Sequence, residues 1–487
     1  MNQDIRNIAP ETVWNHFADL NAVPRPSKKE ERVIQFMVDF GKSLNLDTSV
    51  DKVGNIIIKK PATFGMEDRK AIVMQGHVDM VHQKNADTSF DFEKEGINMF
   101  IDGDWVKAKG TTLGADNGLG VAAIMAVLSS TDVQHPAIEA LFTIDEETGM
   151  TGAMGLEANV LTGEILLNLD TEEDDEIGIG CAGGVDVTAT GSYTSEPIPE
   201  NTKAFKIAVT GLNGGHSGMD IIKGLGNANK IMNRLLFDGY EKYGLRIASI
   251  NGGSLRNAIP RESFATVVID NASKKSFLEE SDILIDKIKN EFASLEQNLN
   301  IEITETETPA NILDTLSQRN LVKATYAALN GVYRMSPDVE GLVETSNNVA
   351  KITVENGEIE ILCLTRSSSE SNKWDLANAI RSAFELAGFI VDFSGSYPGW
   401  LPNMNSSILK VVESTYIKLF KEQPNVAACH AGLECGILGK NYPEMEMISF
   451  GPNIKGAHSP DERAQISSTQ KFWKLLLEVL KNIPKEG

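Results

Sequence analysis

Short apolar runs that end in acidic or imidazole side chains are the feature that most constrains the fold of this chain. The segment 118–128, between two of these runs, has the apolar pattern of a helix. Strands that alternate with helices in this way are typical of a largely parallel sheet. We therefore expect an α/β core. The predicted strands are 72–74, 140–144, 165–169 and 445–450.

A different pattern fills the middle of the chain. It contains four strand-like runs and three helix-like segments, and Asn356-Gly357 inside the last run is a strong hairpin signal. We predict an inserted α+β domain over 187–397 and a catalytic domain made of 1–186 and 398–487. A capping box, Ser27 to Glu30, also predicts a helix over 28–44 near the start. The predicted strands of the insert are 205–212, 245–250, 264–269 and 352–364, and its helices are 226–236, 276–295 and 373–387.

The net charge excludes several classes of protein. The 487 residues include 45 Lys and Arg and 68 Asp and Glu, which gives 45 − 68 = −23. Such a chain repels nucleic acid and anionic lipid, and no run approaches the ~18 apolar residues of a membrane helix. The start, Met1 to Arg6, lacks the pattern of a secretory signal. We therefore expect no nucleic-acid or membrane partner and a cytoplasmic location.

The polar residues at the predicted strand ends suit a metal centre. The carboxyl ends of parallel strands meet at one edge of a sheet, so residues distant in sequence converge there. Histidines and carboxylates without thiolates suit Zn²⁺, Mn²⁺ or Co²⁺, and five ligands are too many for one ion. We predict two ions about 3.5–4 Å apart with one bridging carboxylate. Asp116 would bridge, His77 and Asp170 would complete one site, and Glu147 and His458 the other.

Two further acids have predicted catalytic roles. Asp79 follows His77 by two residues, so in extended chain both side chains project to the same side and Asp79 orients the imidazole. Glu146 and Glu147 are adjacent and would point opposite ways in extended chain. Glu147 can then bind metal while Glu146 acts as general base, takes a proton from the bound water to give the metal-bridging hydroxide, and returns that proton to the leaving amine.

Each motif also has a simpler interpretation. His77-Val78-Asp79 could be a surface pair, and Glu146-Glu147 a solvated turn. The segment 114–120 could be a helix start with Asp116 as N-cap, or a phosphate cradle, although it lacks the Lys-Ser/Thr of a P-loop. His216, flanked by glycines, either presents its ring to a cavity or lies in a flexible surface loop. The remaining histidines carry no second ligand signature, although the small residues after His430 could line a pocket; they are His16, His82, His135 and His430.

Taken together, the motifs resemble those of the aminoacyl-histidine dipeptidases, also called cytosolic non-specific or Xaa-His dipeptidases. This family belongs to the two-metal metallopeptidase clan that includes glutamate carboxypeptidase and aminoacylase. The resemblance covers nearly the whole chain. The motifs that carry it are 75–81, 110–120, 168–173, 256–261, 430–436 and 456–462.

The resemblance implies a two-metal, exopeptidase-like catalytic domain with an inserted lid domain that also forms a homodimer. It implies the same five metal ligands and the same roles for Asp79 and Glu146. It further implies that His216 contacts the oxyanion or the substrate, in its own subunit or a neighbour's. Asn257 and Arg366 would bind the substrate's terminal carboxylate, for which arginine offers a bidentate fork.

The expected activity is that of a metallopeptidase, a hydrolase acting on peptide bonds. It would cleave short unblocked dipeptides, including Xaa-His such as β-alanyl-histidine, with two divalent ions per subunit and Zn²⁺ as the first choice. Two alternatives stay open. One is an N-acyl-amino-acid deacylase on the same scaffold, and the other is a catalytically silent binding protein.

Overall fold

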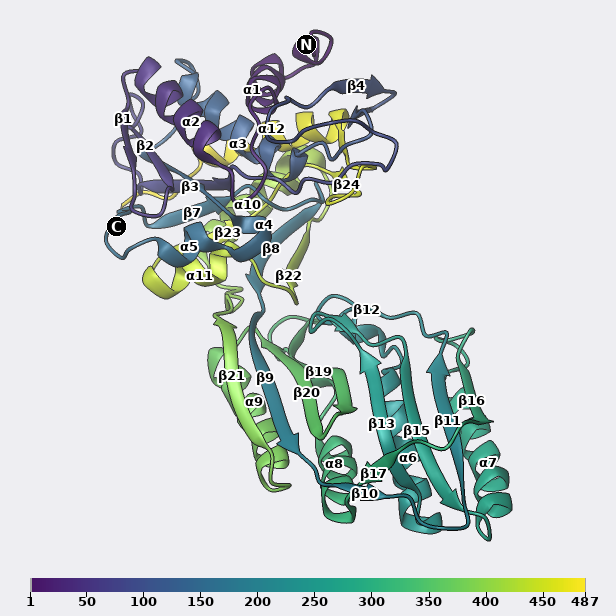
Figure 1. Cartoon of the computed structure of the whole chain (residues 1–487). Helices are drawn as coiled ribbons and strands as arrows, with labels where there is room; N and C mark the ends of the chain where they lie inside the picture. The colour runs from purple at the N-terminus through teal and green to yellow at the C-terminus, as the bar shows by residue number, and fades with distance from the viewer. Residues whose placement is uncertain (1, 487) are drawn as a thin grey trace. The chain divides into compact units, whose positions relative to one another are not determined.

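The chain folds into two compact units in a computed structural model that describes residues 2–486 (Figure 1). The first unit contains the residues up to Gly180, then Pro402–Ala428 and the residues from Leu433 on. The second unit contains Cys181–Leu401 and Cys429–Gly432. The predicted insert, 187–397, falls within the second unit.

The first unit is built on an eight-stranded sheet, as counted over the described residues. Its middle strands β6, β3, β7 and β23 are parallel, and the pairings of β1 with β2, β2 with β6 and β23 with β8 are antiparallel. The middle strands are buried, as expected of parallel strands covered on both faces. The predicted α/β fold with a largely parallel centre is therefore confirmed. In sheet order the strands are β1 Asp47–Val50, β2 Ile56–Lys60, β6 Ile138–Thr143, β3 Ile72–His77, β7 Ile165–Asn168, β23 Glu446–Ser449, β8 Glu176–Cys181 and β22 Asn425–Cys429.

Helix α3, Ala115–Ser129, is the central helix of this unit. It is apolar around its circumference and almost fully buried against β3 and α1. Gly120 lets it approach closely, since a Cβ there would lie 2.2 Å from the Leu169 carbonyl oxygen. The helix start is thereby fixed beside the end of β7. The other helices are η1 Ile5–Asn7, α1 Glu11–Asn21, α2 Glu31–Ser43, α4 Glu146–Gly149, α5 Thr151–Gly155, α10 Ser407–Phe420, α11 Glu434–Asn441 and α12 Ile466–Lys481. A small antiparallel sheet adds β24 Ile454–Lys455, β25 Arg463–Gln465, β5 Trp105–Ala108 and β4 Met99–Asp102.

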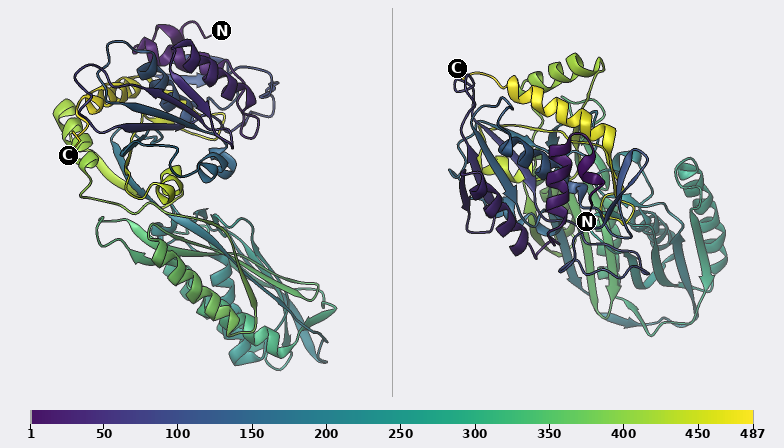
Figure 2. Two further views of the ribbon diagram at one scale, coloured as in Figure 1. Left: turned by 90° about the vertical axis from the view of Figure 1, so that its left-hand side faces the viewer. Right: turned by 90° about the horizontal axis from the view of Figure 1, so that it is seen from above.

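The second unit is an antiparallel sheet packed against helices, as Figure 2 shows. Its core lies between the sheet and α6 to α9. The predicted hairpin is confirmed: β19 and β20 pair through Glu355 and Glu358, and Asn356 and Gly357 have φ of 54° and 85°. The main strands are β16 Asn300–Glu305, β11 Thr202–Thr210, β15 Ser263–Asp270, β13 Arg246–Gly253, β19 Val343–Glu355, β20 Glu358–Ser367, β9 Gly183–Ser192, β21 Ile390–Tyr397 and, beside β19, β18 Gly331–Met335. The remaining elements are β10 Ser195–Pro197, β12 Gly215–His216, β14 Ala258–Ile259, β17 Asn311–Leu313, η2 Ile221–Lys223, α6 Ala228–Tyr243, α7 Lys274–Phe292, α8 Thr315–Ala327 and α9 Glu370–Glu385.

The predicted capping box at Ser27 is wrong. Helix α2 begins at Glu31, and its N-cap residue, Glu30, makes no side-chain cap hydrogen bond. Glu30 instead accepts a hydrogen bond from the Lys28 backbone amide, and the Ser27 hydroxyl donates to Asp79 Oδ2 at 2.8 Å. The Ser27 side chain therefore makes a hydrogen bond to a distant residue and does not cap the helix.

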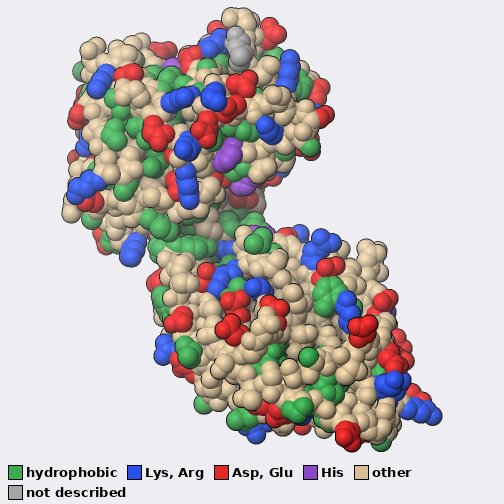
Figure 3. Space-filling view, viewed as in Figure 1, with side chains coloured by type: hydrophobic (Ala, Val, Ile, Leu, Met, Phe, Trp, Pro, Cys, Tyr) green, Lys and Arg blue, Asp and Glu red, His purple; other side chains and the backbone are tan. Residues whose placement is uncertain are grey.

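The exposed surface carries charged side chains of both signs. In the face shown in Figure 3, basic side chains are interspersed with acidic ones on each unit. Over the described residues, no helix has both the length and the apolar character needed to cross a membrane.

Candidate metal centre and catalytic residues

Five side chains at the carboxyl edge of the first unit's sheet form two overlapping groups. In each group the potential ligand atoms lie within 4.8 Å of one another. Asp116 belongs to both, because its Oδ1 lies 3.1 Å from His77 Nε2 and its Oδ2 lies 3.2 Å from His458 Nε2. Its two oxygens thus face different histidines, which is the arrangement a bridging carboxylate needs. The groups are His77, Asp116 and Asp170, and Asp116, Glu147 and His458.

The residues of both groups fit divalent cations. His77 Nε2 lies 3.6 Å from Asp170 Oδ1, and His458 Nε2 lies 3.0 Å from Glu147 Oε2. Asp170 Oδ1 and Glu147 Oε1 are buried and have no hydrogen-bond partner among the described residues. Buried carboxylate oxygens without partners are costly unless a cation or a donor satisfies them. Nitrogen and oxygen donors of this kind suit Zn²⁺, Mn²⁺ or Co²⁺.

The electrostatics of the cluster point the same way. Burial raises the pKa of Asp170 well above its ordinary value, and nearby carboxylates add to the shift. Burial also acts to raise the pKa of Asp116, but hydrogen bonds from His458 and His77 outweigh it and lower that pKa. Hydrogen bonds to Asp116 and Glu147 raise the pKa of His458 to about 11. Positive charge beside these buried carboxylates would offset the effect of burial, and two divalent ions would supply it.

Asp79 connects two parts of this cluster. It is fully buried, and its Oδ1 lies 3.4 Å from His77 Nδ1. The backbone amides of Glu146 and Glu147 donate to its two oxygens, at 3.1 and 3.3 Å. Asp79 therefore fixes the imidazole and also the turn that carries both glutamates.

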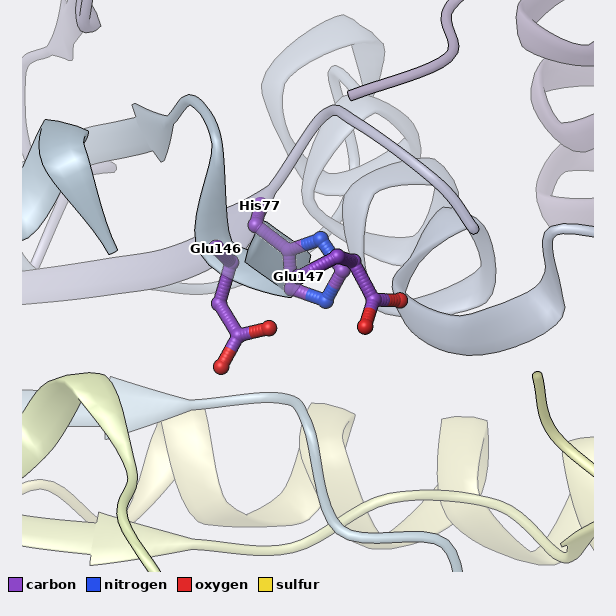
Figure 4. Close-up of side chains that lie close together, drawn as sticks. All are labelled: His77, Glu146 and Glu147. Atoms are coloured by element: carbon purple, nitrogen blue, oxygen red, sulfur yellow. The ribbon is translucent and has the colours of Figure 1, made fainter. Parts of the chain in front are cut away.

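Glu146 and Glu147 lie in a helical turn, so the expectation of extended chain is wrong. Asp145 has a left-handed φ of 53°, which turns the chain sharply after β6 and starts the short helix α4. Its carboxylate accepts hydrogen bonds from the Thr148 and Thr151 hydroxyls, which stabilise this turn. In the view of Figure 4, the carboxylates of Glu146 and Glu147 lie on either side of the His77 ring. Burial, together with nearby carboxylates and against the His77 charge, raises the pKa of Glu146 to about 8.

Glu462 was missed by the sequence analysis as a residue that shapes the site. It is buried, and its two carboxylate oxygens accept hydrogen bonds from four consecutive backbone amides, Leu113 to Asp116. It therefore holds the segment that carries Asp116. Its chain position, four residues after His458 within the motif 456–462, was the available signal.

The second unit brings His216 and Arg366 together. His216 Nδ1 accepts from the backbone amides of Gly218 and Met219, which leaves Nε2 3.5 Å from Arg366 Nη2. Arg366 is 4% exposed and donates to the Tyr397 hydroxyl at 2.8 Å, but it forms no ion pair with a described residue. A buried guanidinium without an anion is suited to a carboxylate ligand. Asn257 is exposed, and its backbone oxygen accepts from the amide of Ser217, next to His216.

The remaining histidines make contacts that account for them without a metal. His16 Nε2 lies 3.0 Å from the Ser129 hydroxyl, and His135 Nδ1 lies 2.7 Å from the Pro136 carbonyl oxygen. The ring of His82 packs edge-on against Phe92. His430 is buried with Nε2 2.8 Å from the Ser346 hydroxyl, and burial lowers its pKa to about 3.

Comparison with known proteins identifies the family of this chain. Residues 73–482 match the model of peptidase family M20/M25/M40. The chain is 45% identical over 482 residues to the cytosol non-specific dipeptidase of Escherichia coli (strain K12), covering 99% of both proteins. It also matches the crystal structure of aminoacylhistidine dipeptidase from Vibrio alginolyticus, with a TM-score of 0.95, 44% identity and 99% of both chains covered.

A more distant structure shares the fold. Aminopeptidase PepT from Bacillus cereus matches with a TM-score of 0.57 and 15% identity, over 98% of this chain and 99% of that one. The family model and the two similar dipeptidases each span most of the sequence. This chain is therefore a member of peptidase family M20/M25/M40.

Proposed function

We propose that the protein hydrolyses the peptide bond of short unblocked dipeptides, including Xaa-His dipeptides such as β-alanyl-histidine. The observation that carries this proposal is the position of Asp116, whose two oxygens face His77 and His458 in two overlapping ligand groups. The names of the two similar proteins, a non-specific dipeptidase and an aminoacylhistidine dipeptidase, support the choice of substrate.

Two divalent ions would be held by His77, Asp116, Glu147, Asp170 and His458, with Zn²⁺ preferred over Mn²⁺ or Co²⁺. Such ions, when bound, lower the pKa of water and polarise a carbonyl. Zn²⁺ suits the site because imidazole and carboxylate are its ordinary ligands in catalytic centres.

The protein's own residues then have separate tasks. Glu146 accepts the proton of the attacking water and delivers it to the leaving amine. Asp79 positions His77 and the Glu146 turn through the contacts described above. His216 stabilises the oxyanion through Nε2, and Arg366 and Asn257 bind the terminal carboxylate of the substrate.

Reconstitution of metal-stripped protein tests this function. Protein reloaded with each ion in turn should hydrolyse a dipeptide panel, and Glu146→Gln should bind two ions but turn over slowly. Protein that binds two ions and cleaves no dipeptide would favour a silent binding protein. Faster cleavage of N-acetyl-carnosine than of carnosine would favour an N-acyl-amino-acid deacylase.

We further propose that the protein is a homodimer through its second unit and acts in the cytoplasm on small substrates. The edge strand β18 supports the dimer, because Val332, Tyr333 and Met335 on it are 37%, 49% and 42% exposed. Exposed apolar edge strands readily pair with another chain. The location is supported by the name of the similar cytosol dipeptidase. Sedimentation of the purified protein, with Tyr333→Lys as comparison, tests the dimer: a wild-type monomer would refute it.

A further inference from the structure

Glu434 is a buried carboxylate with one oxygen free. It is the first residue of α11 and is 2% exposed. Its Oε2 accepts hydrogen bonds from Gln75 Nε2 at 2.6 Å and from the Thr143 hydroxyl at 2.7 Å. Its Oε1 has no hydrogen-bond partner among the described residues. A carboxylate oxygen left in this state is costly unless something binds there.

Glu434 is a buried acidic side chain without a cationic partner among the described residues. No Lys, Arg or His in the described part of the chain forms an ion pair with it. Burial raises its pKa to about 7, against the lowering effect of the His77 charge and the hydrogen bonds to Oε2. Glu434 is also absent from every group of potential metal-ligand atoms found among the described residues. The free oxygen therefore suits a cation that is neither a side chain of this protein nor one of the two proposed metal ions.

Glu434 lies at the edge of the sheet where the reaction would occur. Its partner Gln75 is two residues before His77 on β3, and its partner Thr143 is the last residue of β6, three before Glu146. Through these two hydrogen bonds the carboxylate is held at the ends of the two neighbouring strands that lead to His77 and to Glu146.

The free ammonium group of a dipeptide lies close to the peptide carbonyl that is attacked. In an α- or β-amino acid the ammonium is only a few bonds from the carbonyl carbon that is attacked. A substrate whose carbonyl is held beside Glu146 must therefore place its ammonium in the immediate surroundings. An ammonium bound to a buried carboxylate makes a charge-assisted hydrogen bond, which is stronger than a neutral one.

We propose that Glu434 Oε1 binds the free ammonium group of the substrate's amino-terminal residue. This inference rests on the proposed function and explains how the site would select unblocked substrates over acylated ones. The hydrogen bonds from Gln75 and Thr143 hold the carboxylate in place, so it is pre-organised before substrate binds.

The test compares alanyl-histidine with propionyl-histidine, which has the same carbon skeleton but a hydrogen atom in place of the ammonium group. Glu434→Gln keeps an oxygen for Gln75 and Thr143 and removes the charge. We expect kcat/KM for alanyl-histidine to fall at least about 20-fold, the loss of one hydrogen bond to a charged group. For propionyl-histidine it should change less than about threefold. Where propionyl-histidine is cleaved too slowly, its inhibition constant against alanyl-histidine replaces its kcat/KM.

Two controls separate this role from a structural one. Glu444→Gln, at an exposed site just beyond α11, should leave both substrates unchanged. Glu434→Asp keeps the charge and should preserve most of the preference for alanyl-histidine, even if it lowers overall activity. An equal loss on both substrates in Glu434→Gln, with metal content and thermal unfolding unchanged, would overturn the inference. Wild-type protein that cleaves neither substrate would instead overturn the proposed function.

Discussion

Replacing Glu462 by glutamine would test how the Asp116 segment is held. Glu462 Oε2 accepts from the amides of Leu113 and Gly114, at 2.7 and 3.0 Å. Its Oε1 accepts from Ala115 and Asp116, at 2.7 and 3.2 Å. Glutamine has the same shape but only one oxygen. Its amide nitrogen cannot accept, so two of the four backbone donors would face another donor.

The structure gives the size of the effect. Glu462 is 2% exposed, so water cannot readily replace the lost acceptor. A hydrogen bond to a charged group contributes ~1.5–3 kcal/mol, so losing two of them corresponds to about 3–6 kcal/mol. Rearrangement of the segment would recover part of this. We therefore expect the free energy of unfolding to fall by about 3 kcal/mol.

Urea unfolding of the metal-free proteins measures this loss directly. The matched control is Asp461→Asn, a neighbouring substitution at an exposed position, which should change the unfolding free energy by less than about 0.5 kcal/mol. Calorimetric titration with Zn²⁺ should also show weaker binding in Glu462→Gln, because Asp116 is shared by both ligand groups. Unfolding and Zn²⁺ binding equal to wild type would show that these four hydrogen bonds do not hold the segment.

Four further predictions follow from the site. Glu146→Gln should retain two ions by elemental analysis and lose at least ~100-fold in kcat, whereas a loss of metal would contradict its role as base. Arg366→Lys should raise KM at least about tenfold for dipeptides, because lysine lacks the bidentate fork that binds a carboxylate. KM should not rise for dipeptides whose C-terminal carboxylate is replaced by an amide, and an equal rise for both kinds of substrate would refute carboxylate binding. Gly120→Ala should lower the unfolding free energy by about 1–3 kcal/mol, because its Cβ would meet the Leu169 carbonyl; an unchanged urea midpoint would contradict this contact. Metal-free protein should lose stability as the pH rises from about 4.5 to about 8, because burial raises the pKa of Glu146 and the folded protein therefore binds a proton there more tightly than the unfolded chain does. The pKa of His458 is also raised in the folded protein, so its contribution to stability is lost as the pH rises above about 6.5. Urea midpoints that rise with pH over this range would contradict the predicted loss of stability.

The sequence could predict the residues at the strand ends because one physical rule places them. His77 is the last residue of one buried parallel strand, Glu147 and Asp170 follow two others, and parallel strands share an edge. That rule needs no knowledge of contacts between distant residues. It was sufficient for the α/β fold and for choosing the candidate ligands.

Residues whose role depends on a distant partner could not be found in this way. Ser27 looks like a helix cap locally, but its hydroxyl donates to Asp79, 52 residues away. Glu462 reaches amides almost 350 residues earlier in the chain. The conformation of Glu146 and Glu147 depends on the left-handed φ of Asp145, which an extended-chain argument cannot anticipate. In each case a tertiary hydrogen bond or one backbone angle overrides the local pattern.

Near each of the two histidines, His77 and His458, an acidic residue makes hydrogen bonds to the backbone of a segment that carries another proposed metal ligand. The segment of His77 carries Asp79, which binds the backbone of Glu146 and Glu147. The segment of His458 carries Glu462, which binds the backbone up to Asp116. In the proposed assignment His77 and Glu147 bind different ions, so Asp79 would connect the two metal sites through the backbone, and Asp116 would connect them by being shared. A change that loosens either acid must therefore disturb both ions, and the two sites should gain or lose metal together.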